Sequence, residues 1–227
     1  VVCRRQRQMC IRDRYLACGF YLMYPGDDVI NAYLPGMGTT WGISLAGLTA
    51  NYDLGYSDAA DFFFQVVFVA TAMSIVSGAV AERMRLIPFF IFAVVMTGFI
   101  YPVQGYWKWG GGWLDAIGYT DFAGSGVVHL CGASAALAAV LILGARSGKY
   151  GADGSVTVMR GSNIPIAALG AFILWLGWFG FNGGSQLAVH TVDNANAVAQ
   201  VFLNTNAAAA GGVLGAIIIS KILTGKM

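Results

Sequence analysis

The sequence predicts an all-α polytopic membrane protein, and two observations lead to this fold class. Hydrophobic residues occupy 57% of the 227 positions and charged residues only 11%, whereas an ordinary soluble domain carries about 25% charged residues. So few charges cannot cover a water-facing surface, which excludes a soluble globular enzyme and a disordered chain. The apolar residues also fall in long stretches, each about long enough to cross a hydrocarbon core of roughly 30 Å as a helix.

Five apolar stretches predict five complete membrane spans. They cover residues 62–81, 87–107, 122–144, 164–182 and 196–220. A sixth stretch, 15–24, is too short to cross the membrane, and we expect it to be the tail of a further helix. The segment 25–60 is rich in Gly, Asp, Tyr and Thr, which favours a polar loop. We therefore expect about five full spans plus part of one.

The first 14 residues differ abruptly in composition from the rest of the chain. They contain five of the 13 basic residues and only one acidic residue. They lack the apolar core of a signal peptide and resemble a translated adapter sequence, with a short basic cytoplasmic tail as the alternative. We set residues 1–14 apart and assign the membrane domain to residues 15–227, which have a net charge of −2. No nucleic-acid partner is expected.

Basic residues in the short loops predict how the chain is oriented in the membrane. Loops on one side carry seven basic residues, and loops on the other side carry Lys108 alone. The seven are Arg83, Arg85, Arg146, Lys149, Arg160, Lys221 and Lys226. We therefore expect a multi-pass protein of a plasma or bacterial inner membrane, with these loops in the cytoplasm.

His129 is the only ionisable side chain in its apolar stretch after Asp121. Ionisable groups inside a membrane commonly mark a transport pathway or proton relay; the alternative is a neutral histidine bonded to a neighbouring helix. Eight residues at 1.5 Å each place His129 about 12 Å below Asp121, near the midplane where transporter sites lie. Asp121 is expected to act as a helix N-cap rather than as a direct ligand. Cys18 and Cys131 lie in apolar contexts, so no disulfide framework, metal site or cofactor is expected.

Aromatic residues and one serine gather at the expected outer ends of the spans. They are Phe64, Phe68, Trp109, Phe181 and Ser185. Ordered by expected depth, they form an aromatic cup with one hydroxyl, followed by a phenyl constriction above the histidine. Aromatic faces attract a small cation by about 2 kcal/mol when it is desolvated, and ammonium can pass a constriction by giving up its proton. An interfacial aromatic belt is the alternative explanation.

Four segments resemble the family of ammonium transporters, methylammonium permeases and Rh proteins. They are FFFQVVFVATAMSIVSGAVAERMR (62–85), WKWGGGWLD (107–115), DFAGSGVVHLCGASAALAAVLILGAR (121–146) and NIPIAALGAFILWLGWFGFNGGS (163–185). The bacterial-type transporters are the nearer match, because both the outer tryptophan and the AER segment are present. The resemblance implies an eleven-span homotrimer in which five spans repeat the previous five with inverted topology. This chain would then hold the end of span 2 and all of spans 3 to 7, about half of the transporter.

The resemblance also implies a role for each candidate residue. Phe64, Phe68, Trp109 and Ser185 would form the outer ammonium-recruitment site, Phe68 and Phe181 the gate, His129 the first pore histidine, and Asp121 the structural aspartate below the recruitment site. It implies ammonium or ammonia as substrate, methylammonium as an analogue, and a cytoplasmic regulatory signal protein as partner. The second pore histidine belongs to a later span, so we do not expect this chain alone to conduct. A membrane ammonium sensor and a haem-binding redox protein with His129 as a ligand are the other functions considered.

Overall fold

The computed structural model describes residues 18–25, 29–36, 50–51 and 56–225. Segment 1–14, set apart above, lies outside the described residues. The chain divides into two compact units, Val1–Met159 and Arg160–Met227, and each is described by itself. Within the described residues, five helical segments are long and apolar enough to cross a membrane. They confirm the five predicted spans.

Among the described residues of the first unit, the regular elements are helices and one very short hairpin. In chain order it contains α2 (Phe20–Met23), β1 (Ala50–Asn51), β2 (Tyr56–Ser57), α3 (Asp58–Val80), α4 (Leu86–Val95), η3 (Met96–Ile100), α5 (Tyr101–Lys108), α6 (Trp113–Ala116), η4 (Ser125–Leu130) and α7 (Cys131–Leu143). The segments η3 and η4 are π-helical turns. The two strands pair antiparallel, with Ala50 opposite Ser57. This hairpin lies in the segment that the sequence analysis treated only as a polar loop.

The second span is one rod assembled from α4, η3 and α5, and its irregular centre has a chemical cause. Pro102 has no N–H to donate to the carbonyl four residues earlier, and its ring crowds that carbonyl. The preceding turn widens into η3, which is a common way for a helix to absorb such a defect. The carbonyl in question belongs to Gly98, and it accepts a hydrogen bond from the thiol of Cys18 at 3.6 Å. Thr97 bonds back to the carbonyl of Ala93 at 2.8 Å.

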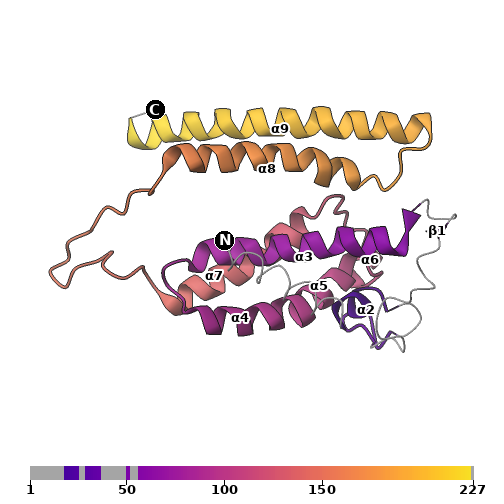
Figure 1. Ribbon diagram of the computed structural model, residues 1–227, viewed down its shortest axis with the longest axis horizontal. Coiled ribbons are helices and arrows are strands. Elements are labelled where there is room, and N and C mark those ends of the chain that lie inside the picture. Colours follow the sequence, from indigo (N-terminus) through magenta and orange to yellow (C-terminus); the bar gives the residue numbers. More distant parts are fainter. Residues whose placement is uncertain (1–17, 26–28, 37–49, 52–55, 226–227) are drawn as a thin grey trace. The chain divides into compact units, whose positions relative to one another are not determined.

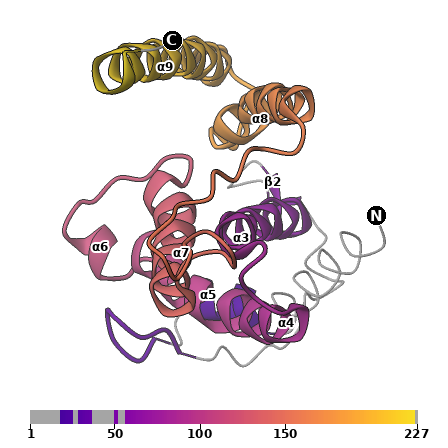
Figure 2. The ribbon, with the colours of Figure 1, turned by 90° about the vertical axis from the view of Figure 1, so that its left-hand side faces the viewer.

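Close packing of α3 against α7 forms the centre of the first unit (Figures 1 and 2). The contact depends on Gly132, because a Cβ atom there would lie 2.7 Å from the carbonyl oxygen of Ala72. Small residues let helix backbones approach in this way within membranes. Phe68 and Met73 of α3 and Tyr101 of α5 are buried in the same core.

The second unit is a pair of helices, α8 (Ile164–Gly184) and α9 (Val192–Thr224). Each begins with a side-chain cap: Asn163 accepts the N–H of Ile166, and Thr191 accepts the N–H of Asn194. Such caps satisfy backbone donors that have no partner inside the helix. The two helices lie side by side in Figure 1.

Polar and aromatic contacts join α8 to α9. Asn182 donates to the hydroxyl of Thr205 at 2.9 Å, and the rings of Phe179 and Phe202 meet edge to face at 5.3 Å. Elsewhere both helices expose large apolar side chains. Such an apolar surface is more stable in contact with the hydrocarbon of a membrane than in contact with water.

Candidate functional site

Three aromatic side chains of the first unit form a continuous cluster; their spacing in the sequence predicted only that Phe64 and Phe68 share a helix face. The rings of Phe64 and Phe68 meet edge to face with centroids 4.7 Å apart. Phe68 then contacts Trp109, with ring centroids 5.5 Å apart and planes inclined at 53°. Phe68 is only 3% exposed. The two phenylalanines come from adjacent turns of α3, and the tryptophan comes from the residue that caps α5.

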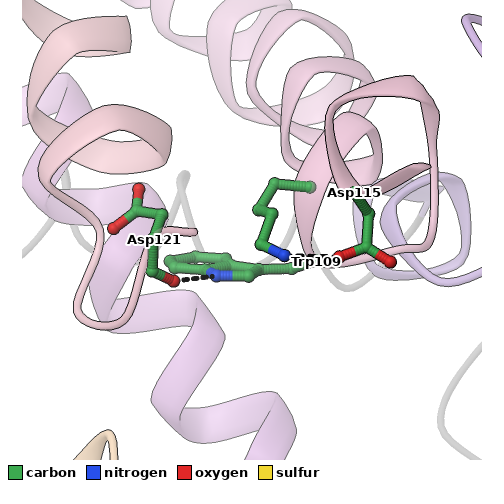
Figure 3. Close-up of polar contacts among 4 residues, drawn as sticks. Trp109, Asp115 and Asp121 are labelled. Carbon is green, nitrogen blue, oxygen red and sulfur yellow. Dashed lines mark hydrogen bonds and ion pairs between the residues drawn. The ribbon is translucent and has the colours of Figure 1, made fainter. Parts of the chain in front are cut away.

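The indole of Trp109 is held in place by a hydrogen bond at its far edge. Its ring N–H donates to the backbone carbonyl of Asp121 at 3.0 Å, as Figure 3 shows. An indole has one donor and no acceptor, so this bond fixes the ring edge and leaves the π faces for packing or binding. The aromatic cluster and the start of η4 are therefore one connected structure.

Asp121 organises the entry to the His129 segment through both of its carboxylate oxygens. Oδ1 accepts the N–H groups of Gly124 and Ser125 at 2.8 and 3.0 Å. Oδ2 accepts those of Gly126 and Val127 at 2.9 and 2.7 Å. The side chain is 6% exposed, and a negative group is favourable at the start of a helix. The N-cap position of η4 is Gly124, so Asp121 is not the N-cap residue that the sequence predicted. Its carboxylate nevertheless accepts the first backbone N–H groups of the helix from three residues before that position.

The cation nearest to the cluster in the sequence is neutralised. Lys108 forms an ion pair with Asp115, which follows it by seven residues in the sequence. Asp115, the acidic partner, lies on the other side of Trp109 from Asp121 in the view of Figure 3. Pairing removes a positive charge that would repel a cation approaching the tryptophan.

His129 lies on the π-helical turn η4, just before α7 begins. The turn starts at Gly124, whose φ of +92° is a left-handed conformation that favours glycine. The carbonyl of Gly124 accepts the N–H groups of both Val128 and His129 at 2.9 Å. Gln104 of α5 donates to the carbonyl of Val127 at 2.7 Å. The imidazole itself is exposed on the first unit.

Phe181 and Ser185 belong to the second unit, at the C-terminal end of α8. The Ser185 hydroxyl donates to the carbonyl of Phe181 at 2.7 Å. Its proton is therefore committed to its own helix, and its remaining lone pairs can only accept. The structure thus brings Phe64, Phe68, Trp109 and Asp121 together within one unit. The positions of Phe181 and Ser185 relative to that cluster stay predictions.

Sequence reasoning missed Gln104, which holds the turn that carries His129. A signal was present, since Gln104 is the only amide side chain in the apolar stretch 87–107. A buried amide in a membrane span needs a partner. Which carbonyl it would meet could not be told from one sequence, because that depends on the packing of α5 against η4.

A sequence profile described as the Ammonium Transporter Family matches residues 10–227. The chain belongs to the ammonium transporter family. Among its relatives is the ammonium transporter Amt2 of Archaeoglobus fulgidus, which is 42% identical over 222 residues, covering 93% of this chain and 44% of the relative. The family resemblance expected from the four sequence segments is therefore confirmed.

Two solved structures of similar proteins support the same fold. One is titled Sensor Amt Protein; it has a TM-score of 0.83 at 36% identity and covers 97% of this chain and 53% of its own. Another is Mep2 of Candida albicans, with a TM-score of 0.80 at 29% identity, covering 98% and 47% respectively. The chain spans about half the length of the curated relatives it matches. Family membership and five apolar helices identify an integral membrane protein.

Proposed function

We propose that the protein containing this chain transports ammonium or ammonia across a cell membrane. The aromatic cluster of Phe64, Phe68 and Trp109 is the outer recruitment site for the cation. Three features of the first unit support this role: fixed aromatic faces, a buried carboxylate behind them, and a neutralised lysine beside them. The names of the relatives, which are ammonium transporters, agree with it.

The assignment of the recruitment site depends mainly on the orientation of the Trp109 ring. A cation held against an indole face gains about 0.5–2 kcal/mol, provided that the face is presented to it. The bond from the indole N–H to the Asp121 carbonyl fixes the edge of the ring, so the face is set before the cation arrives. Because no ring motion has to be frozen on binding, less of the attraction is lost to ordering.

Ser185 complements the aromatic faces by chemistry that suits ammonium. Its hydroxyl donates to the Phe181 carbonyl and therefore offers only acceptor lone pairs to a ligand. Ammonium has four N–H donors, so it can use that acceptor. Na⁺ and K⁺ can bind an oxygen too, but they cannot become small neutral molecules by releasing a proton.

Below the cup, Phe68 and Phe181 form a phenyl gate that opposes hydrated ions. Ammonium loses water in the cup and, near the gate, passes its proton to a water molecule of the cup. Ammonia continues past His129, and the imidazole relays the proton inward. The turn η4 places the imidazole two residues before the start of α7. A neutral imidazole there can exchange hydrogen bonds with ammonia without leaving a charge in the pathway.

The test is uptake of labelled methylammonium by cells that lack their own ammonium transporters. The cells express the protein together with whatever sequence flanks residues 1–227 in its gene. We expect Trp109→Leu to weaken uptake at low substrate concentration about 2- to 30-fold, the equivalent of the lost cation–π energy. Trp175→Leu is the matched control, because Trp175 lies on α8 ten residues before Ser185 and off the helix face that carries Phe181 and Ser185. Equal uptake by the two variants would place the recruitment site elsewhere.

His129 is tested separately by ion selectivity. We expect His129→Ala to abolish electrogenic ammonium transport or to let K⁺ through, because the imidazole is the polar group below the gate. The same cells with a voltage clamp, or proteoliposomes with a K⁺ gradient, provide the measurement. Unchanged ammonium currents and unchanged exclusion of K⁺ would contradict the assigned role.

A membrane ammonium sensor is the second candidate function. The 36% identity to a structure titled Sensor Amt Protein, over 97% of this chain, favours it. A sensor would bind ammonium in the same cup without net uptake. Methylammonium uptake above the background of untransformed cells would exclude a sensor that does not transport.

Assembly and location complete the proposal. The protein forms a homotrimer in a plasma or bacterial inner membrane, and a cytoplasmic signal protein regulates it. The split of basic residues, seven on one side and Lys108 on the other, supports a cytoplasmic position for the basic loops. Protease accessibility of the loop 144–163 in sealed vesicles of known sidedness is the direct measurement.

A further inference from the structure

Two residues of the proposed pathway, Phe181 and Ser185, lie near the C-terminal end of α8. They are four residues apart, which places both side chains on the same side of the helix. The tip of a large side chain lies about 5 Å from the helix axis, so a rotation of about 10° moves it by about 1 Å. A binding site needs its groups held within about 0.5 Å of the productive geometry. The rotation of α8 about its own axis therefore has to be fixed.

Apolar contacts alone do not fix that rotation. The surface of α8 consists mainly of aliphatic and aromatic side chains, and large ones such as Leu169, Ile173 and Leu176 are exposed. Hydrophobic attraction is non-directional, and in a membrane it hardly distinguishes a neighbouring helix from lipid. Asn182 is the only side chain of α8 that has both a hydrogen-bond donor and an acceptor. It is therefore the residue of this helix that can give the interface a direction.

Asn182 forms a hydrogen bond across the interface between α8 and α9. Its Nδ2 donates to Oγ1 of Thr205 at 2.9 Å, and Thr205 is only 7% exposed. In an apolar interface, a rotated arrangement of the helices would leave both polar groups unpaired, which costs free energy. A single asparagine fixes the register of coiled-coil helices in the same way. The pair thus selects one rotation of α8 against α9.

The shape of the interface agrees with that rotation. The ring of Phe202 on α9 meets the ring of Phe179 edge to face at 5.3 Å. A Cβ atom at Gly183 would collide with the same ring. Phe179 and Gly183 are four residues apart on α8, so the ring of Phe202 lies across one helix face. Just beyond the helix, Gln186 donates to Oδ1 of Asn194 at 3.1 Å.

The face of α8 that contacts α9 differs from the face that carries the pathway residues. At 3.6 residues per turn, Phe181 lies roughly 150° and Ser185 roughly 110° around the axis from the centre of the residues 179, 182 and 183. The Ser185 hydroxyl donates to the carbonyl of Phe181 at 2.7 Å, so the serine turns together with the helix. Once the contact face of α8 is set against α9, the directions of both pathway residues are set as well.

We propose that Asn182 and Thr205 are positioning residues of the ammonium pathway. Their hydrogen bond fixes the rotation of the C-terminal end of α8, and through it the directions of the Phe181 ring and the Ser185 hydroxyl. This role rests on the proposed transport function, in which Phe181 belongs to the gate and Ser185 to the recruitment site. Without the bond, only a fraction of the molecules has the binding geometry, and the apparent affinity for the cation falls by that fraction.

The test is the concentration dependence of methylammonium uptake by cells that lack their own ammonium transporters and express the protein with its flanking sequence. Thr205→Val removes the hydroxyl and keeps the shape of the side chain, whereas Thr205→Ser keeps the hydroxyl and is the matched control. We expect Thr205→Val to raise the half-saturating concentration about 3- to 15-fold, the equivalent of one hydrogen bond between membrane helices. We expect Thr205→Ser to retain most of the affinity. Adding Asn182→Leu to Thr205→Val should change little, because both substitutions remove the same bond.

A merely structural role of the bond would give a different result. Loss of folded protein lowers the maximum rate and leaves the half-saturating concentration unchanged, and this outcome would overturn the proposal. Equal half-saturating concentrations in Thr205→Val and Thr205→Ser would overturn it as well. If Trp109→Leu weakens uptake while the two Thr205 variants behave alike, the recruitment site stands and only the positioning role fails. If neither Trp109→Leu nor Thr205→Val alters uptake, the proposed recruitment site fails and the positioning role fails with it.

The rotation itself can be measured without transport. 4-Fluorophenylalanine incorporated at Phe181 reports the surroundings of that ring by fluorine NMR of the protein in detergent. We expect one resonance in the otherwise unaltered protein and in Thr205→Ser, and a shifted or second resonance in Thr205→Val. The same single resonance in all three proteins would show that the bond does not set the direction of Phe181 and would overturn the proposal.

Discussion

Replacing Asp121 with asparagine is the sharpest test of how the His129 segment is built. The carboxylate accepts four backbone N–H groups, two on each oxygen. An amide keeps one oxygen and turns its NH₂ group toward the other two donors. In either orientation, one buried and one partly buried N–H lose their acceptor. At about 1–3 kcal/mol for each unsatisfied donor, we expect a loss of about 2–6 kcal/mol in the free energy of unfolding.

The assay is an unfolding titration of the chain in detergent micelles, followed by tryptophan fluorescence and by circular dichroism. Asp115→Asn is the matched control, because it removes one carboxylate from a partly exposed ion pair that is worth about 0–1 kcal/mol. If Asp121→Asn destabilised the chain no more than Asp115→Asn, the four N–H bonds would not hold the turn as argued. A shifted Trp109 emission in Asp121→Asn is expected as well, since the indole bonds to the same residue.

Two further predictions concern the bonds that hold irregular backbone. Gln104→Leu removes the hydrogen bond from the side-chain amide to the Val127 carbonyl in η4. We expect a loss of about 0.5–1.5 kcal/mol in the same titration, and no loss would show that this bond does not hold the turn. The pKa of Asp153 lies below its ordinary value, because the hydroxyl and N–H of Ser155 bond to its carboxylate. The turn is therefore stabilised while Asp153 is ionised, and this contribution disappears as the pH falls through the lowered pKa. The Ser155 amide resonance should titrate in that acidic range and lose its pH dependence in Asp153→Ala; titration at the ordinary carboxyl pKa would contradict the bond.

The spans could be predicted because their cause is local. Length and hydrophobicity alone select a membrane helix, and all five stretches are helical in the structure. The ends of the spans were predicted less accurately. The last span was expected over 196–220, whereas the helix α9 runs from Val192 to Thr224. Polar residues such as Asn194 can continue a helix beyond the hydrocarbon, and hydrophobicity does not register that continuation.

The aromatic cluster was predictable for a related reason. Phe64 and Phe68 share a face by helical spacing, and their contact follows from α3 alone. The contact of Phe68 with Trp109 joins two helices 41 residues apart, and only the depth ordering of the spans suggested it. The role of Gln104 and the two π-helical turns could not be predicted, because they depend on Pro102, Gly124 and the tertiary packing around them. Relations between the two units stay predictions.

The turn η4 has a consequence for how the chain can change by mutation. A π-helical turn contains one residue more than the α-helical turn that it replaces. Deleting Leu130, the residue between His129 and Cys131, would convert the turn to an α-helix and rotate everything before the deletion by about 100° relative to α7. The Gly132 contact with α3 would survive, while the imidazole of His129 would face a different neighbour. Because of the extra residue, the direction of the His129 side chain is not fixed by the packing of α7 against α3. Mutations can therefore change the one without changing the other.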